Sequence, residues 1–248
     1  MTPPKKLVEI NEVLHIITYP KNVAEIGVAR SKKLTELGIK GIYDYGPLFV
    51  EGLRVLGKGH SSIVLLAKHE SIGDVAVKIR RTDSKKDSLF REGYLMTLDR
   101  FGVMPKVHYF DDDLIIMEFI DGVTLGKYLR TNDVKGATLL KLIMNVLTAA
   151  YKLDLNLIDH LELANPYKHI FILKDMEVKI IDFESAKVSE NPCNLCRIVS
   201  YLTNLLRISK QSNMEVMLKK YKSGCRDSFQ DILTSLTSVM AQLNGISV

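Results

Sequence analysis

The chain has 248 residues, of which 46% are hydrophobic and 25% are charged, a composition typical of a globular protein with a substantial core. Its formal net charge of +5 at pH 7 permits contact with phosphates or nucleic acid but does not require it. No apolar run approaches the roughly 18 residues that a membrane span needs, and the first residues lack the apolar core of a signal sequence. We therefore expect a cytoplasmic protein without membrane contact.

The three cysteines are Cys193, Cys196 and Cys225. The first two have the spacing of a metal or redox motif, but a structural zinc site needs four ligands and no histidine follows Cys196. We interpret them as an ordinary pair at the start of a helix and expect no metal–thiolate site.

Residues 1–48 precede the first recognisable motif. The stretch 21–37 has a loose apolar face and ends at Gly38, which predicts a helix packed on the neighbouring part of the chain. Its basic residues are also candidates for contact with RNA: Arg30, Lys32 and Lys33.

From residue 50 the pattern changes to short β-rich runs separated by turns. The predicted elements are strands at 53–57, 63–68 and 74–80, a helix at 84–99, and strands at 105–110 and 114–119.

The second half is predicted to be mostly helical. A long helix capped by Asp133 runs to about residue 153, followed by a loop at 158–169. A hairpin at 170–173 and 178–181 follows, and then helices near 193–209, 213–221 and 226–243.

Three short motifs in a fixed order describe a nucleotide phosphate site. A glycine-rich turn begins at Gly57, Val-Ala-Val-Lys occupies 75–78, and Lys-Ile-Ile-Asp-Phe-Glu occupies 179–184. Such a turn covers phosphates, a strand lysine binds them, and an aspartate at a strand end holds a metal ion. Together the motifs resemble the protein kinase-like superfamily, over about residues 50–187.

The glycine turn resembles the kinase pattern GxGxxGxV, with Ser62 at the third glycine. The resemblance implies that backbone N–H groups and serine hydroxyls bind the phosphates of ATP. The residues assigned to this role are Gly57, Lys58, Gly59, Ser61, Ser62 and Val64. Without its neighbours, the same segment would be an ordinary hairpin turn.

Lys78 ends an apolar strand, so we expect a buried alkyl stem and an ammonium group that points into a cleft. The resemblance makes Glu92 its partner, which orders the lysine on the α- and β-phosphates, and assigns Ala76 to the nucleotide pocket. The alternatives are a surface lysine with a buried stem and a solvated helix glutamate.

Residues 115–122 resemble the strand and hinge between kinase lobes. The resemblance implies that adenine lies among apolar side chains and hydrogen-bonds to the backbone near Glu118 and Phe119, with Met117 at the back of the pocket. The alternative is a buried strand that ends in a turn.

The kinase triplet Asp-Phe-Gly is here Asp182-Phe183-Glu184. The aspartate that binds magnesium is kept, and Glu184 argues against a switch that flips the backbone at this point. Mg²⁺ prefers carboxylate and triphosphate oxygens as ligands. The resemblance therefore implies ATP and Mg²⁺ (or Mn²⁺), with Asp182 as a metal ligand.

The catalytic loop departs from the family pattern. His160-Leu161-Glu162 stands in place of His-Arg-Asp or His-Gly-Asp, so Glu162 is the candidate base. Glutamate and aspartate are carboxylic acids of similar strength, so the chemistry survives on a side chain that is one methylene longer. His169 takes the position of the metal-binding asparagine and is the second candidate metal ligand.

Other residues of this loop are also candidates. Lys168 would neutralise the transferred phosphate, and Asp159 or Asn165 would take over the role of Glu162 or of His169. An ordinary connecting loop with a solvated Glu162 is the structural alternative.

No Ala-Pro-Glu motif follows Asp182, so the platform that holds a peptide in most protein kinases is absent or rebuilt. The variant motifs look like those of a small archaeal-type group of predicted serine/threonine kinases related to the RIO and other atypical kinases.

These expectations describe an α+β protein with a two-lobed protein kinase-like fold. Its parts would be an N-terminal helical extension at 1–48, a five-stranded antiparallel N-lobe at 49–119, and a short, mostly helical C-lobe at 120–248. The expected activity is transfer of the γ-phosphate of ATP to a hydroxyl, first of a protein serine or threonine and including autophosphorylation. The alternatives are a nucleotide-gated RNA- or ribosome-associated module or ATPase, a small-molecule kinase, and a pseudokinase.

Overall fold

The computed structural model describes residues 5–206 and 212–242 and divides the chain into two compact units. Unit 1 comprises residues 1–97 and 106–119, and unit 2 comprises residues 98–105 and 120–248. The structure is a mixed α+β protein with antiparallel sheets, which confirms the expected class. The expected junction after residue 119 coincides with a boundary between the units, whereas residues 1–48 belong to unit 1 and form no separate part.

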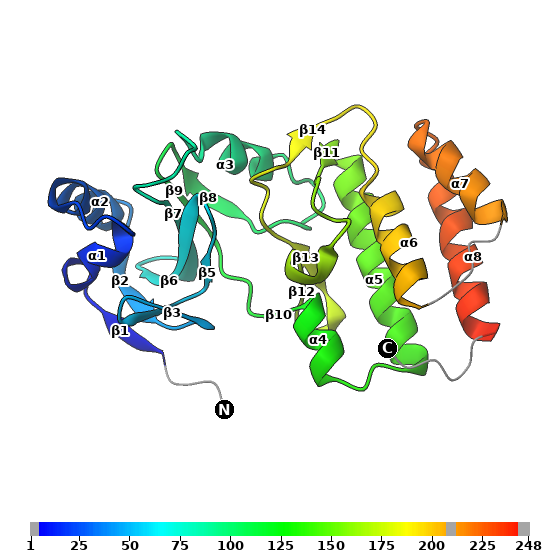
Figure 1. Cartoon of the computed structure of the whole chain (residues 1–248), viewed down its shortest axis with the longest axis horizontal. Coiled ribbons are helices and arrows are strands. Elements are labelled where there is room, and N and C mark those ends of the chain that lie inside the picture. The colour runs from blue at the N-terminus through cyan, green and yellow to red at the C-terminus, as the bar shows by residue number, and fades with distance from the viewer. Residues whose placement is uncertain (1–4, 207–211, 243–248) are drawn as a thin grey trace. The chain divides into compact units, whose positions relative to one another are not determined.

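The main element of unit 1 is an antiparallel sheet of seven strands (Figure 1). Six of them follow the order β1-β2-β6-β7-β9-β8, and β5 pairs with β6. Their bounds are β1 Lys6–Val8, β2 Ile39–Asp44, β5 Gly57–Lys58, β6 Ser62–His69, β7 Gly73–Arg80, β8 Val107–Phe110 and β9 Leu114–Glu118. A separate hairpin consists of β3 (Leu48–Val50) and β4 (Leu53–Val55). The expected five strands were too few because β1 and β2 extend the sheet beyond β6.

The N-terminal segment supplies part of the core of unit 1. It contains the 3-10 helix η1 (Ile10–Val13), the short helix α1 (Leu14–Ile17) and the helix α2 (Ala24–Glu36), which confirms the helix expected at 21–37. Ile16, Ile17 and Leu34 are fully buried in the same cluster as the apolar residues of β6 and β7. Residues 1–48 are therefore not an extension, because their apolar side chains complete the core beneath the sheet.

All three cations proposed to contact RNA have ion-pair partners inside unit 1. Arg30 is 4% exposed, donates to the carbonyl of Ile17 at 2.7 Å and forms an ion pair with Asp113 at 3.1 Å. Lys33 forms an ion pair with Asp111. Lys32 pairs with Glu36 on the same helix at 3.8 Å, and its side chain is 77% exposed, against 40% for Lys33. Contact of this segment with RNA stays a prediction.

The helix expected at 84–99 begins later, because α3 spans Phe90–Thr97. The preceding residues form turns, in which the hydroxyl of Ser84 accepts from the amide of Lys86 and the hydroxyl of Ser88 accepts from the amide of Phe90. Serine side chains compete with the helix for backbone N–H groups, which is why the helix starts only after Ser88.

Unit 2 contains the predicted long helix and several shorter elements (Figure 1). Its helices are α4 Leu125–Thr131, α5 Gly136–Leu155, α6 Asn194–Leu205, α7 Ser212–Lys222 and α8 Ser228–Gln242. One small sheet has the order β10 (Val123–Thr124), β12 (Ile170–Ile172), β13 (Val178–Ile180), and a second pairs β11 (Ile158–Asp159) with β14 (Lys187–Val188).

Several boundaries in unit 2 differ from expectation. The structure confirms the hairpin at 170–181, but it adds α4, which the sequence did not predict, and it places Lys135 rather than Asp133 at the cap of α5. The carboxylate of Asp133 instead pairs with the ammonium group of Lys135. The predicted helix ends at 207–209 and at residue 243 lie outside the described residues.

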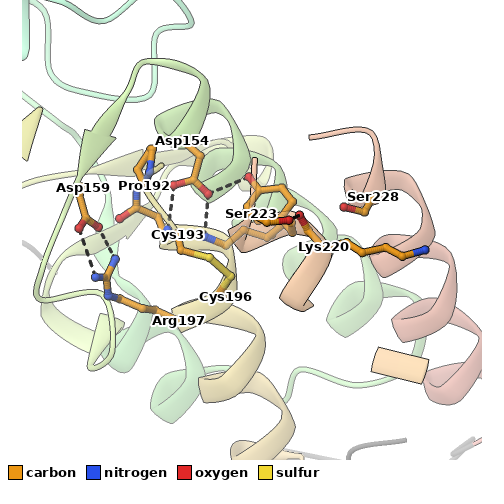
Figure 2. Close-up of a disulfide and its surroundings, with 12 residues drawn as sticks. Asp154, Asp159, Pro192, Cys193, Cys196, Arg197, Lys220, Ser223 and Ser228 are labelled. Atoms are coloured by element: carbon orange, nitrogen blue, oxygen red, sulfur yellow. Dashed lines mark hydrogen bonds and ion pairs between the residues drawn. A yellow bond between two sulfur atoms is a disulfide. The ribbon is translucent and has the colours of Figure 1, made fainter. Parts of the chain in front are cut away.

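Cys193 and Cys196 form a disulfide at the start of α6, which corrects the expected pair of unlinked cysteines (Figure 2). Their Cα atoms are 5.2 Å apart because the first helical turn brings them together, a separation that suits a disulfide. Cys225 is free and exposed. Within the described ranges, no helix has both the length and the apolar character to cross a membrane.

Candidate active site

Lys78 and Glu92 form a buried ion pair in unit 1. The Nζ atom of Lys78, on β7, donates to both carboxylate oxygens of Glu92, on α3, at 2.7 Å each. The two residues are 5% and 6% exposed. The next residue, Gly93, allows this approach, because a Cβ atom there would lie 2.5 Å from the side chain of Phe110. The predicted pairing of Lys78 with Glu92 is thus confirmed.

The glycine motif forms a tight hairpin. Gly57 pairs with Val64 and Lys58 with Ile63 across β5 and β6, and the amide of Gly59 donates to the carbonyl of Ser62 at 2.9 Å. Ser61 and Ser62 are each 3% exposed, so a ligand would first meet the backbone of this hairpin rather than the two serine side chains.

Two residues that the sequence analysis did not single out hold this hairpin. The guanidinium group of Arg81 donates to the carbonyl of Gly59 at 2.9 Å, and its centre lies 5.0 Å from the ring centroid of Tyr19. The ammonium group of Lys58 donates to the Tyr19 hydroxyl at 3.3 Å. Tyr19 lies far from the motif in sequence, so no local pattern could have indicated this contact.

The predicted adenine-binding strand is β9. Met117 lies opposite Ala76 and Glu118 lies opposite Val75 in the pairing with β7, so Ala76 and Met117 are neighbours as the assignment requires. The amide of Glu118 donates to the carbonyl of Lys106 at 2.8 Å within the sheet, so this amide is already used. The ring of Phe119 meets that of Tyr45 edge-on, with 6.2 Å between centroids.

In unit 2, three of the predicted residues come together around one imidazole. The Nε2 atom of His169 lies 3.3 Å from a carboxylate oxygen of Glu162, and its Nδ1 atom lies 3.9 Å from one of Asp182. The imidazole is 12% exposed, whereas the two carboxylate side chains are 42% and 41% exposed. The cluster therefore presents two accessible carboxylates that a largely buried histidine holds apart.

His160 packs against the imidazole of His169 and is itself buried. It is 1% exposed, its Nε2 atom donates to the carbonyl of Ile181 at 3.0 Å, and its ring lies 5.3 Å from that of His169. Burial lowers the pKa of His160, and its contact with the Ile181 carbonyl fixes the backbone just before Asp182.

The backbone at Asp182 is in the left-handed region, with φ at +67°. This conformation is uncommon outside glycine, although aspartate adopts it more readily than most residues. Phe183, which follows, is fully buried and meets the ring of His160 at 5.1 Å between centroids. The buried phenylalanine anchors the turn that leaves the Asp182 carboxylate accessible.

The segment before Glu162 is tied to the start of α6 by Asn194. The Oδ1 atom of Asn194 accepts from the amide of His160 at 2.9 Å, and its Nδ2 atom donates to the carbonyl of Ile158 at 2.6 Å. Asn194 is itself fully buried. Sequence reasoning missed this residue, because its partners are contributed by the loop more than thirty positions earlier.

Asn194 is held in turn by Asp154 of α5. The carboxylate of Asp154 accepts from the backbone and side-chain nitrogens of Asn194, from the amide of Leu195 and from the hydroxyl of Tyr221. Figure 2 shows Asp154 near the disulfide of Cys193 and Cys196, with dashed lines that leave its carboxylate. Burial raises the pKa of Asp154 to about 6, against its ordinary 3.8.

The remaining predicted residues of the loop lie elsewhere. The carboxylate of Asp159 is 12% exposed and forms an ion pair with Arg197 of α6 (Figure 2), which gives Asp159 a supporting contact. Asn165 and Lys168 are exposed and line a cavity with residues of α4.

Asp182 and His169 differ in how well they suit magnesium. Asp182 offers an accessible carboxylate of the kind that Mg²⁺ prefers, whereas an imidazole between two carboxylates is a poorer ligand for this hard cation. No group of three or more His, Cys, Asp or Glu side chains in the described part of the chain has the arrangement of a complete metal site. Mg²⁺ usually keeps waters and takes one or two carboxylates together with phosphate oxygens, so Asp182 with Glu162 fits that requirement better than Asp182 with His169.

No protein-family model matches the chain, and no curated protein matches it in sequence.

Proposed function

We propose that this protein is an ATP- and Mg²⁺-dependent phosphotransferase of the atypical kinase type, with a two-lobed kinase-like fold, that transfers the γ-phosphate to a hydroxyl group. A serine or threonine of a protein, including one of its own, is the first acceptor to test. The observation that carries the proposal is the buried pair of Lys78 and Glu92. A lysine that is fixed by a glutamate on a neighbouring helix is suited to bind phosphate oxygens in one orientation.

The roles of the other groups follow from their own surroundings. Backbone N–H groups of the glycine hairpin are assigned to the phosphates, except for the Gly59 amide, which already donates to Ser62. Ala76 and Met117 are assigned to the adenine pocket. Glu162 is assigned to the acceptor hydroxyl, because its carboxylate is accessible and oriented by the imidazole of His169.

Asp182 is the residue assigned to the metal ion. Bound Mg²⁺ would neutralise charge on the phosphate oxygens during transfer. His169 is assigned a positioning role between Glu162 and Asp182 rather than the ligand role that the resemblance implied, because both of its nitrogens face carboxylates.

The test is incubation of the purified protein with γ-labelled ATP and Mg²⁺ or Mn²⁺. Transfer of label should occur in the wild type and in Lys68→Ala, whose side chain is 45% exposed on β6. It should be lost in Lys78→Met and in Asp182→Asn. Because Lys78→Met also removes a buried ion-pair partner, the assay is run at a temperature at which melting curves show every variant to be folded. Label transfer by Asp182→Asn would contradict the metal assignment.

A further inference from the structure

A cavity of about 530 Å³ lies within unit 2, between α4, the loop before β12 and the end of α6. Its volume is within the range of about 300 to 1,000 Å³ that is usual for small-molecule sites. The residues that give it polar character are Thr124, Arg130, Asn165 and Lys168.

The charged side chains known to line the cavity are positive. Of the described residues, Arg130 and Lys168 line it, and no aspartate or glutamate among them does. Both cations are exposed, and within the described part of the chain neither forms an ion pair. Two like charges beside one cavity repel each other, and an anion bound between them would remove this cost.

The walls that carry these cations are packed tightly against each other. A Cβ atom at Gly126 would lie 2.9 Å from the ring of Tyr167 and 3.2 Å from its Cβ, so the backbone of α4 rests directly on the loop. Tyr167 meets the ring of Tyr201 edge-on at 5.2 Å, which ties the loop to α6. Arg130 and Lys168 are therefore carried by elements whose separation is fixed by contact.

The cavity is also next to the proposed catalytic cluster along the chain. Lys168 directly precedes His169, whose imidazole contacts Glu162. A molecule bound in this cavity would thus be held by the same loop that carries the residue assigned to the acceptor hydroxyl.

We infer that this cavity binds an anionic group, a phosphate or a carboxylate, of the molecule that accepts the phosphoryl group. That the bound molecule is the acceptor rests on the proposed function, whereas the anion site itself is a property of unit 2. Arg130 would supply a bidentate contact and Lys168 a point charge, while Asn165 and Thr124 would orient the rest of the molecule.

The test is calorimetric titration with O-phospho-L-serine, at low ionic strength and without nucleotide or metal. Loss of one charge-assisted contact should weaken binding about tenfold or more in Arg130→Gln and in Lys168→Gln. Lys127→Gln is the matched control, since Lys127 is exposed on the same helix α4 but does not line the cavity. L-serine, which lacks the phosphate group and its additional negative charge, should bind more weakly than its phosphate ester.

Several results would overturn the inference. Absence of binding, equal binding by Arg130→Gln and wild type, or an equal loss in Lys127→Gln would each do so. Loss in Lys78→Met with Arg130→Gln unaffected would place the anion in unit 1 instead. Gly126→Ala provides a second variant without a charge change, and it should weaken binding because the added methyl displaces Tyr167.

The labelled-ATP experiment separates this inference from the proposed function. Label transfer without binding of the probe would leave the phosphotransferase proposal standing and reject the anion site. Binding of the probe without label transfer would do the reverse. Competition by a serine peptide flanked by glutamates would assign the anion to a protein acceptor, and binding of the probe without such competition would assign it to a small molecule.

Discussion

The ammonium nitrogen of Lys78 lies 2.7 Å from both carboxylate oxygens of Glu92, and each side chain is only 6% exposed. A pair this deeply buried gains much from mutual attraction but loses the hydration of both charges. Such a pair is weak evidence for stability, and the proposed binding of a phosphate-bearing ligand would give it a role.

The same geometry predicts non-additive effects on stability. Lys78→Met leaves the Glu92 carboxylate buried without its partner and should lower the free energy of unfolding by about 3–5 kcal/mol. Lys78→Met/Glu92→Leu removes both charges and should recover much of this loss. Urea unfolding of the two single variants and the double variant measures the coupling. Strictly additive losses would show that the two side chains do not interact as described.

The N-terminal segment should be essential to unit 1. Leu34→Ala removes a fully buried side chain of α2 and should cost about 2–5 kcal/mol in the free energy of unfolding. Val28→Ala, on the same helix but 63% exposed, is the control and should change stability little. Equal effects of the two substitutions would mean that α2 does not pack on the core of the sheet.

The buried carboxylate of Asp154 predicts a pH dependence of stability. Its pKa is raised from 3.8 to about 6, so between these values the folded protein holds a proton that the unfolded chain has released. The stabilisation that comes from this bound proton is fully present below pH 3.8 and is lost as the pH rises through 6. In total, the free energy of unfolding falls by about 3 kcal/mol over this range. The charged and titratable groups facing this carboxylate are Tyr221 and Arg226.

Asp154→Asn should therefore flatten the dependence of unfolding free energy on pH between 4 and 6. It should also destabilise the protein at all pH values, because the amide cannot accept all the donors that the carboxylate accepts. Asp231→Asn, at an exposed position of α8, should leave the slope unchanged. Denaturant titrations at a series of pH values provide both measurements, and an unchanged slope in Asp154→Asn would contradict the assignment.

Substitutions of Glu162 and of Asp159 should change different properties, the first the rate of phosphoryl transfer and the second the stability of the fold. Glu162→Gln removes the group assigned to the acceptor hydroxyl and should slow label transfer about 10²- to 10⁴-fold, with little change in melting temperature because the side chain is 42% exposed. Asp159→Asn removes the ion-pair partner of Arg197 and should act mainly on stability. Rates and melting curves of both variants test the distinction, which would fail if Asp159→Asn alone abolished transfer.

Local sequence patterns were sufficient to predict the helices and strands that are determined by local contacts. The alternation of apolar residues predicted β6, β7 and β9, and the helical spacing predicted α5, since both patterns reflect which side of an element is buried. The pairing of Lys78 with Glu92 was predicted only through the resemblance to the kinase-like superfamily, and the structure brings the two side chains together from β7 and α3.

The contacts between distant segments were decided by the tertiary structure alone. Arg30 pairs with Asp113, Tyr19 meets Lys58 and Arg81, and Asn194 holds the backbone of His160, and none of these pairs shares a sequence neighbourhood. The contacts of Arg30 and of Tyr19 tie residues 1–48, which were expected to be an extension, to the rest of unit 1. The contact of Asn194 with His160 fixes the loop that carries Glu162.

The sequence by itself determined the alternation of apolar and polar residues, the glycine turn, and the acidic and basic residues that a phosphate site requires. Only the tertiary structure decided that the imidazole of His169 stands between Glu162 and Asp182, and that Arg130 and Lys168 line one cavity. The physical reason is that a charge has its effect through the groups within a few ångströms of it, and the folded chain chooses those groups from segments that lie far apart in sequence.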